Sequence, residues 1–149
     1  MNNNSFMKMA LVQAKKAAEI GEVPIGTVIV KDGKVISKAY NLREKSNLST
    51  GHAEILAIER ANKKLNSWRL DDCEMYVTIE PCPMCGGAII QSRIKKVYYG
   101  AKDKKAGVHQ SITNLFELPF NHKVKIESGI MEKECREIMA DFFKNIRKK

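Results

Sequence analysis

The sequence predicts a layered α/β fold built on a mixed β-sheet. Helical segments with one apolar face alternate with short apolar strands along the 149 residues, which is typical of layered α/β proteins. Asp32-Gly33 stands between two such strands and indicates a tight hairpin, so those strands are expected to be antiparallel neighbours. The length fits one compact domain with its own core, and we expect residues 1–149 to form a single domain.

The first helix is expected to begin at Ser5, whose side chain can cap it, and to stop at Gly21. Its apolar face is formed by residues at helical spacing: Phe6, Met9, Ala10, Ala14 and Ala17. After a short loop around Pro24, the two strands of the hairpin are expected at residues 27–30 and 35–40.

The middle of the chain continues the alternation of helices and strands. Apolar residues three and four apart predict helices there, alternation of apolar residues predicts strands, and Pro83 suits the first turn of a helix. The elements are expected in this order: a polar stretch at 41–51, a helix at 52–64, a strand at 75–79, a helix at 83–92, a strand at 97–100, a short helix at 112–117 and a strand at 123–127.

The last helix is expected to start near Met131 and to dock an apolar stripe on the sheet. The stripe consists of Cys135, Ile138, Met139, Phe142 and Ile146. The basic residues at 147–149 suit the negative end of the helix dipole.

The formal net charge is +9, from 26 Lys and Arg residues against 17 Asp and Glu residues. Such an excess favours a polyanionic partner, because cationic side chains neutralise phosphates. Solvated surface lysines explain the same charge equally well, so the charge alone leaves both interpretations open.

Composition also bears on where the protein is expected to work. No apolar run approaches the roughly 20 residues of a membrane-spanning helix. Residues 1–5 contain no basic region leading into an apolar stretch, so no signal peptide is expected. Cys73 and Cys135 are expected to be buried free thiols, and the sequence favours a cytoplasmic protein with no membrane partner.

One motif carries the chemistry. H-x-E at residues 52–54 is followed by P-C-x-x-C at residues 81–85. This order resembles the known signature of the zinc-dependent nucleobase deaminases, in which the carboxylate is not a metal ligand. The resemblance implies that Glu54 is catalytic and that zinc has three protein ligands: His52, Cys82 and Cys85.

Three ligands suit a catalytic zinc, which keeps one position open for water, whereas a structural zinc takes four. The residues that could supply a fourth ligand lie in no paired motif: Cys73, Cys135, His109 and His122. A lone C-x-x-C also occurs in redox pairs, but those normally follow the first strand of their domain. A redox pair and a structural zinc site therefore stay open as minor alternatives.

The expected positions of these residues agree with that chemistry. Cys82 and Cys85 flank the start of a helix, where free N–H groups and the helix dipole stabilise thiolates. His52 is expected in the first turn of its own helix. Zinc lowers the pKa of bound water from 15.7 to about 7. Glu54 would move a proton from that water to the ring nitrogen and then to the leaving amine, which amounts to hydrolytic deamination.

Beyond the motif, residues 7–148 resemble the bacterial-type tRNA-specific adenosine deaminases of the cytidine deaminase-like superfamily. These segments carry the resemblance: E-V-P-I-G at 22–26, Y-N-L-R at 40–43, S-W-R-L at 67–70, S-R-I at 92–94, Y-G-A-K-D at 99–103, N-H at 121–122 and D-F-F at 141–143. The chain departs from the family at Gly51, commonly alanine, and at Pro83 and Gly86, usually valine and alanine.

The resemblance implies an α/β/α fold around a five-stranded mixed sheet, and a homodimer with one Zn²⁺ per subunit. It implies conversion of adenosine to inosine at the wobble position (34) of a tRNA anticodon stem-loop. The residues that it places near the adenine are Val23, Pro24, Ile25, Asn41 and Ala53. Those that it places along the anticodon loop are Asp103, Lys105, Phe142, Phe143, Arg147 and Lys148.

Two other functions fit the motif. A deaminase of a free base or nucleoside, such as cytosine or guanine, shares the zinc chemistry but needs no basic surface. An RNA-binding module with a structural zinc is the non-catalytic alternative. Salt dependence separates the first from a tRNA enzyme, because phosphate contacts weaken steeply as salt rises.

Overall fold

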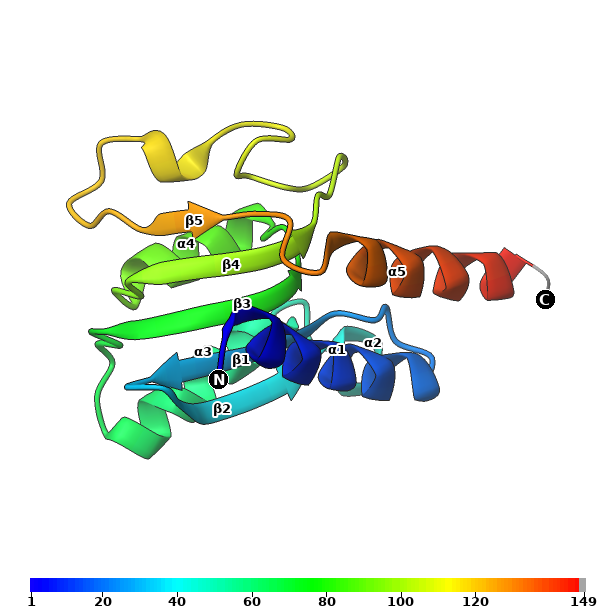
Figure 1. The fold of residues 1–149 in the computed structure, drawn as a ribbon, viewed down its shortest axis with the longest axis horizontal. Coiled ribbons are helices and arrows are strands. Elements are labelled where there is room, and N and C mark those ends of the chain that lie inside the picture. Colours follow the sequence, from blue (N-terminus) through cyan, green and yellow to red (C-terminus); the bar gives the residue numbers. More distant parts are fainter. Residues whose placement is uncertain (148–149) are drawn as a thin grey trace.

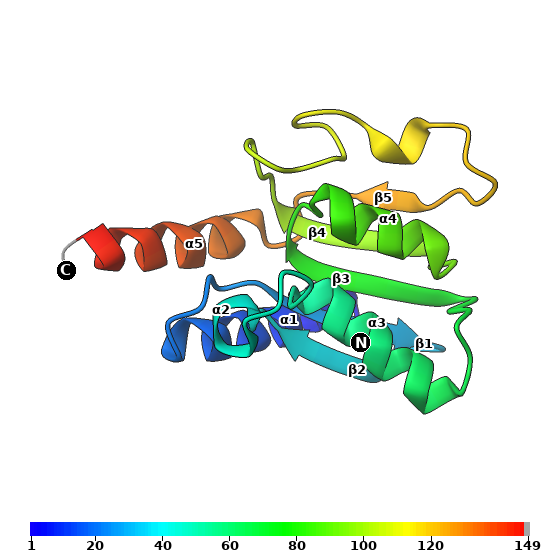
Figure 2. The same cartoon turned by 180° about the vertical axis from the view of Figure 1, so that it is seen from behind.

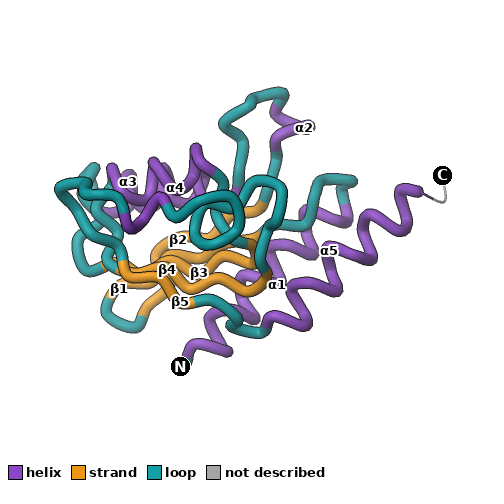
Figure 3. Tube along the Cα trace, turned by 90° about the horizontal axis from the view of Figure 1, so that it is seen from above, coloured by secondary structure: helices purple, strands orange, loops and turns teal. Residues whose placement is uncertain are grey.

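The computed structural model describes the backbone of residues 1–147 and the side chains of residues 1–146. A five-stranded sheet is covered by helices on both faces (Figure 1), which confirms the expected α/β/α layers. Helices α3 and α4 cover one face (Figure 2), while α1 and the start of α5 lie on the other. The view along the sheet shows the three layers edge-on (Figure 3).

The sheet is mixed, as the hairpin predicted. Strand β1 is antiparallel to both β2 and β3, whereas β4 is parallel to both β3 and β5. Asp32 and Gly33 connect β1 to β2 with positive φ angles of 51° and 75°, as a tight hairpin turn requires. The strands, in spatial order, are β2 (Lys34–Tyr40), β1 (Gly26–Lys31), β3 (Cys73–Ile79), β4 (Lys96–Ala101) and β5 (Lys125–Glu127).

Helices occupy nearly the predicted segments. They are α1 (Asn3–Glu19), α2 (Arg43–Ser46), α3 (Ala53–Leu65), α4 (Pro83–Gln91), the 3₁₀ helix η1 (Leu115–Glu117) and α5 (Glu132–Arg147). The predicted cap of α1 was wrong. The side chain of Asn2 accepts a hydrogen bond from the Ser5 N–H at 2.9 Å, so the helix begins before Ser5. The polar stretch at 41–51 was predicted without a helix, but it contains α2.

Two hydrophobic clusters hold the layers together. One fills the space under α3 and α4, with Ile29, Met75 and Ile89 fully buried. The other lies under α1, where Met7 and Val28 are fully buried. The sheet is therefore buried on both faces. Helices α3 and α4 are held side by side against one of these faces, which fixes where each of them begins.

Helix α5 does not dock along the sheet as the stripe predicted. Cys135 is buried where α5 packs beside the end of β4, but Ile146 is 51% exposed. Figure 1 shows α5 extending past the end of the sheet. The prediction failed because β4 ends at Ala101, so the later turns of α5 have no strand beneath them. No helix within the described residues combines the length and apolar character needed to cross a membrane.

Candidate active site

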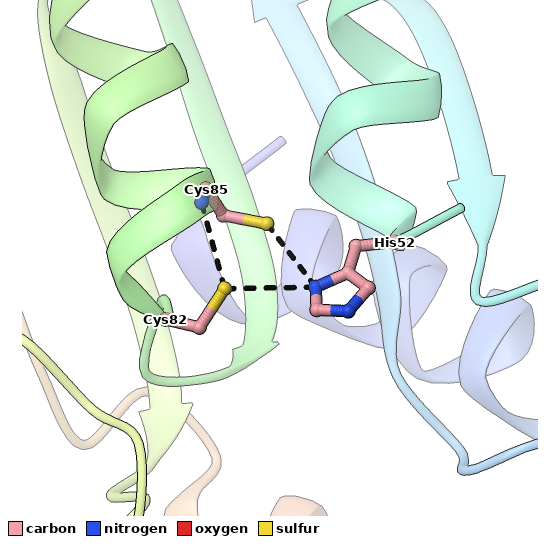
Figure 4. Close-up of side chains that lie close together, drawn as sticks. All are labelled: His52, Cys82 and Cys85. Carbon is pink, nitrogen blue, oxygen red and sulfur yellow. Dashed lines mark hydrogen bonds between the residues drawn. The ribbon is translucent and has the colours of Figure 1, made fainter. Parts of the chain in front are cut away.

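The starts of α3 and α4 bring the H-x-E and P-C-x-x-C motifs together. His52 is the residue just before α3, one position earlier than the predicted first turn. Cys82 caps α4, and Cys85 lies in its first turn. Figure 4 shows the imidazole and both thiols pointing toward one another from the two helices.

The donor atoms of these residues are close enough to share one ion. Nδ1 of His52 lies 3.6 Å from Sγ of Cys82 and 3.5 Å from Sγ of Cys85 (Figure 4). All three donor atoms lie within 4.8 Å of one another, so the group could hold a metal ion.

The surroundings of the two cysteines shift their pKa values in opposite directions. The neighbouring Cys85 thiol, together with hydrogen bonds from His52 and the Cys85 N–H, lowers the pKa of Cys82 to about 4. The proximity of Cys82, together with burial, raises the pKa of Cys85 far above its ordinary value. A cation entering the group would displace the proton held by Cys85, because the thiolate is the form that binds metals.

Glu54 lies beside this group without joining it. It is the second residue of α3 and is only 3% exposed. Burial, reinforced by the Cys82 thiolate, raises the pKa of Glu54 to about 7. A carboxyl group with that pKa can take up and release a proton near neutral pH.

A cavity of about 180 Å³ opens over His52, Glu54 and Cys82. Of the residues that sequence comparison placed near the adenine, three line this cavity: Val23, Ile25 and Asn41. Pro24 and Ala53 are buried and are not among the residues that line it. Asp103, expected beside the anticodon loop, also lines this cavity.

Asn41 is held by the backbone on either side of it. Its Nδ2 donates to the carbonyl of Val23 at 3.2 Å, and its Oδ1 accepts from the N–H of Arg43 at 3.1 Å. Its own N–H donates to the carbonyl of Ile25 at 3.0 Å. One amide hydrogen of Asn41 has no partner among these bonds and can donate into the cavity.

A second cavity, of about 450 Å³, adjoins the first and shares four lining residues with it: Val23, Ile25, Ile79 and Asp103. Its outer wall includes Lys105 and, from α5, Phe143. Phe142 lies elsewhere, in a groove between α1 and α5, so the two phenylalanines do not line one cavity. The side chain of Arg147 and all of Lys148 lie outside the described residues.

Several residues at the site were missed by reasoning from the sequence. Arg43 and Glu80 line the smaller cavity, and Arg136 and Met139 line the larger one. Glu80 directly precedes the P-C-x-x-C motif, which was the one available signal. The residues of α5 gave none, because the spacing of Met139 suggested a core stripe and Arg136 stands in no motif.

Two of the departures from the family lie against the site. A Cβ at Gly51 would approach the Arg43 Cα and the Leu48 carbonyl oxygen to 3.1 Å. The polar segment of residues 43–48 therefore packs closer to Gly51 than it could to alanine. A Cβ at Gly86 would meet only side chains of residues 108, 115 and 116, at 3.0 to 3.4 Å.

Fold and site together are those of a deaminase whose His-Cys-Cys group could hold a metal ion, and similarity to known proteins agrees. The profile of the MafB19-like deaminases matches residues 1–147. The tRNA-specific adenosine deaminase of Bacillus subtilis (strain 168) is 49% identical over 145 residues, covering 97% of this chain and 90% of that protein. The tRNA-specific adenosine deaminase of Aquifex aeolicus (strain VF5) is 48% identical over 148 residues, covering 99% and 97%.

A solved structure agrees as well. It comes from a study of A-to-I editing by tRNA:A34 deaminases at the wobble position of transfer RNA. It superposes with a TM-score of 0.88 at 44% identity, covering 90% of this chain and 98% of that one. The chain belongs to the MafB19-like deaminase family, and its relatives include bacterial tRNA-specific adenosine deaminases.

Proposed function

We propose that this protein hydrolytically deaminates adenosine to inosine at the wobble position (34) of tRNA anticodons. The observation that carries the proposal is buried Glu54 beside the His-Cys-Cys group in one cavity. The choice of substrate is supported by the relatives named tRNA-specific adenosine deaminase, which match nearly the whole chain.

The donor group fits zinc. Zn–S distances of about 2.3 Å and Zn–N distances of about 2.0–2.1 Å in a tetrahedron place sulfur and nitrogen roughly 3.6 Å apart. The corresponding distances here are 3.5 and 3.6 Å. His52, Cys82 and Cys85 would hold one zinc ion per subunit, and bound zinc supplies a Lewis acid that activates water near neutral pH.

Glu54 would transfer the protons. It takes one proton of the attacking water and delivers it to the ring nitrogen of adenine while the water oxygen bonds to C6. It then takes the second proton from the hydroxyl group on C6 and passes it to the amine, which leaves as ammonia when the C6–N bond breaks. The raised pKa of Glu54, about 7, matches both halves of this task.

The other residues of the smaller cavity would bind and orient the base. The free amide hydrogen of Asn41 would donate to the adenine, while Val23 and Ile25 would wall the pocket, with Pro24 buried between them in the chain. Ala53 occupies the first position of α3, where the N–H has no partner within the helix and can face the base.

The larger cavity would receive the nucleotides beside the adenosine. Its rim carries Lys102, Lys104, Lys105 and Arg136, which would neutralise phosphates. Asp103 and Phe143 would contact bases or riboses, and Phe142 and Arg147 would extend the surface along the anticodon loop.

We further propose a cytoplasmic homodimer in which each subunit is a single domain. Apolar side chains around η1 support a contact with a second subunit, because large exposed apolar groups mark interaction surfaces. Ile112 is 61% exposed, Leu118 45% and Phe120 44%.

The direct test uses an anticodon stem-loop RNA with adenine at the wobble position. We expect inosine at that position and one ammonia released for each inosine, whereas the same RNA with guanine there should give no product. Turnover of a free base or nucleoside without turnover of the RNA would establish the alternative, a free-base deaminase.

Binding of that stem-loop should weaken steeply with salt. If the four basic side chains at the rim contact phosphates, raising salt from about 50 to 200 mM should lower the affinity on the order of 50-fold. A filter-binding titration of the Glu54→Gln protein measures this without turnover. An affinity indifferent to salt would contradict the phosphate contacts.

A further inference from the structure

Glu80 is a buried carboxylate with no role in the chemistry described above. It follows β3 directly and is 1% exposed. It accepts five hydrogen bonds from the segment after β4, one of them from the hydroxyl of Ser111. The others come from backbone N–H groups: Asp103 at 3.1 Å, His109 at 2.8 Å, Gln110 at 3.1 Å and Ser111 at 3.3 Å.

These donors span the irregular segment of residues 102–114, which runs from β4 toward η1. The segment has no strand partner to satisfy its N–H groups, and the carboxylate is the acceptor for four of them, from Asp103 and residues 109–111. Gly107 packs directly on it, since a Cβ there would overlap the carboxyl group of Glu80. The segment is thereby folded around one side chain.

The segment after β4 is also hydrogen-bonded to the chain directly beside the metal-binding motif. The N–H of Val108 donates to the carbonyl of Pro81 at 3.0 Å, and Cys82 is the next residue along the chain. Glu80 and Pro81 therefore tie residues 103–111 to the start of α4. Asp103 and Ala106, which line the smaller cavity, are held at a set distance from the His-Cys-Cys group.

We propose that Glu80 is a positioning residue that holds residues 103–111 as a preformed wall of the RNA site. This inference rests on the proposed function, because the wall is assigned to nucleotide contacts. Glu80 thus acts on how tightly the RNA is held and leaves zinc binding and proton transfer to other residues.

The test compares Glu80→Gln with the wild type and with Glu74→Gln, a control on β3, the strand that Glu80 follows. Glutamine keeps the size of the side chain but turns one acceptor oxygen into an NH₂ group that faces the N–H donors. We expect KM for the stem-loop to rise on the order of 10-fold, with a smaller change in kcat and unchanged zinc content. Glu80→Asp, which keeps the carboxylate, should recover part of the loss.

Hydrogen exchange measures the same effect without RNA. In Glu80→Gln, the amides of residues 103–111 should exchange on the order of 10-fold faster, while those of α3 keep their wild-type rates. Because this measurement needs no substrate, it tests the role of Glu80 even if the RNA is not deaminated. Wild-type exchange rates or a wild-type KM would overturn the proposal, and so would loss of zinc.

A second variant guards against a Glu80→Gln protein that fails to fold. Gly107→Ala leaves Glu80 in place but pushes the segment away from it, so KM should rise in the same way. Wild-type exchange and KM in Gly107→Ala would contradict the close packing of the segment on Glu80.

Discussion

Replacement of Glu54 by glutamine is expected to lower kcat on the stem-loop by about 10³-fold while zinc stays bound. Glutamine fills the same buried space beside the His-Cys-Cys group. It cannot accept the proton of water or return it to the leaving amine. Single-turnover formation of inosine measures the loss, and metal analysis of the same preparation measures zinc.

His52→Ala is the matched control for that experiment. It removes one of three donors, so we expect both the metal and the activity to be lost. Loss of zinc from Glu54→Gln would show that Glu54 is itself a ligand. Full activity of Glu54→Gln with zinc bound would show that another group moves the protons.

The contrast between these variants follows from positions on α3. His52 precedes the first turn and faces Cys82 and Cys85, whereas Glu54 lies inside the turn and is buried against the cavity. Under the proposed function, two residues of spacing separate a metal-binding role from a proton-transfer role. The H-x-E pattern predicts this division, and the variants above test it.

Most of the fold could be predicted from patterns that are likewise confined to a few neighbouring residues. Asp32-Gly33 placed the hairpin, because a turn with two positive φ angles selects those residues. The P-C-x-x-C motif placed a helix start, because proline at the first helical position and a capping side chain at Cys82 depend on only a few neighbouring residues.

Features that depend on the meeting of distant segments could not be predicted. The partners of Glu80 lie 23 to 31 residues later, in a segment without periodicity. Helix α5 extends past the sheet because β4 ends where it does in space. The apolar residues of α5 have the same spacing as those of a helix that docks along its whole length, so the sequence did not reveal this. The separation of Phe142 from Phe143 follows from the same geometry.

Gly26→Ala is expected to destabilise the protein by about 3 kcal/mol, at the upper end of the usual cost of overpacking. A Cβ at Gly26 would overlap the Ala10 carbonyl oxygen and the Ala14 nitrogen of α1. These are backbone atoms in a helix packed on the sheet, so no side-chain rotation relieves the overlap. Thermal unfolding should show the melting temperature lowered by roughly 6–12 °C.

Gly87→Ala serves as the control, because nothing lies within 4 Å of a Cβ there and alanine is the better helix former by about 1 kcal/mol. It should melt at or above the wild-type temperature. A wild-type melting temperature for Gly26→Ala would contradict the close approach of α1 to β1. Gly26 also directly follows the wall formed by residues 23–25. Movement of α1 should therefore displace that wall, and Gly26→Ala should deaminate the stem-loop more slowly even at temperatures where it stays folded.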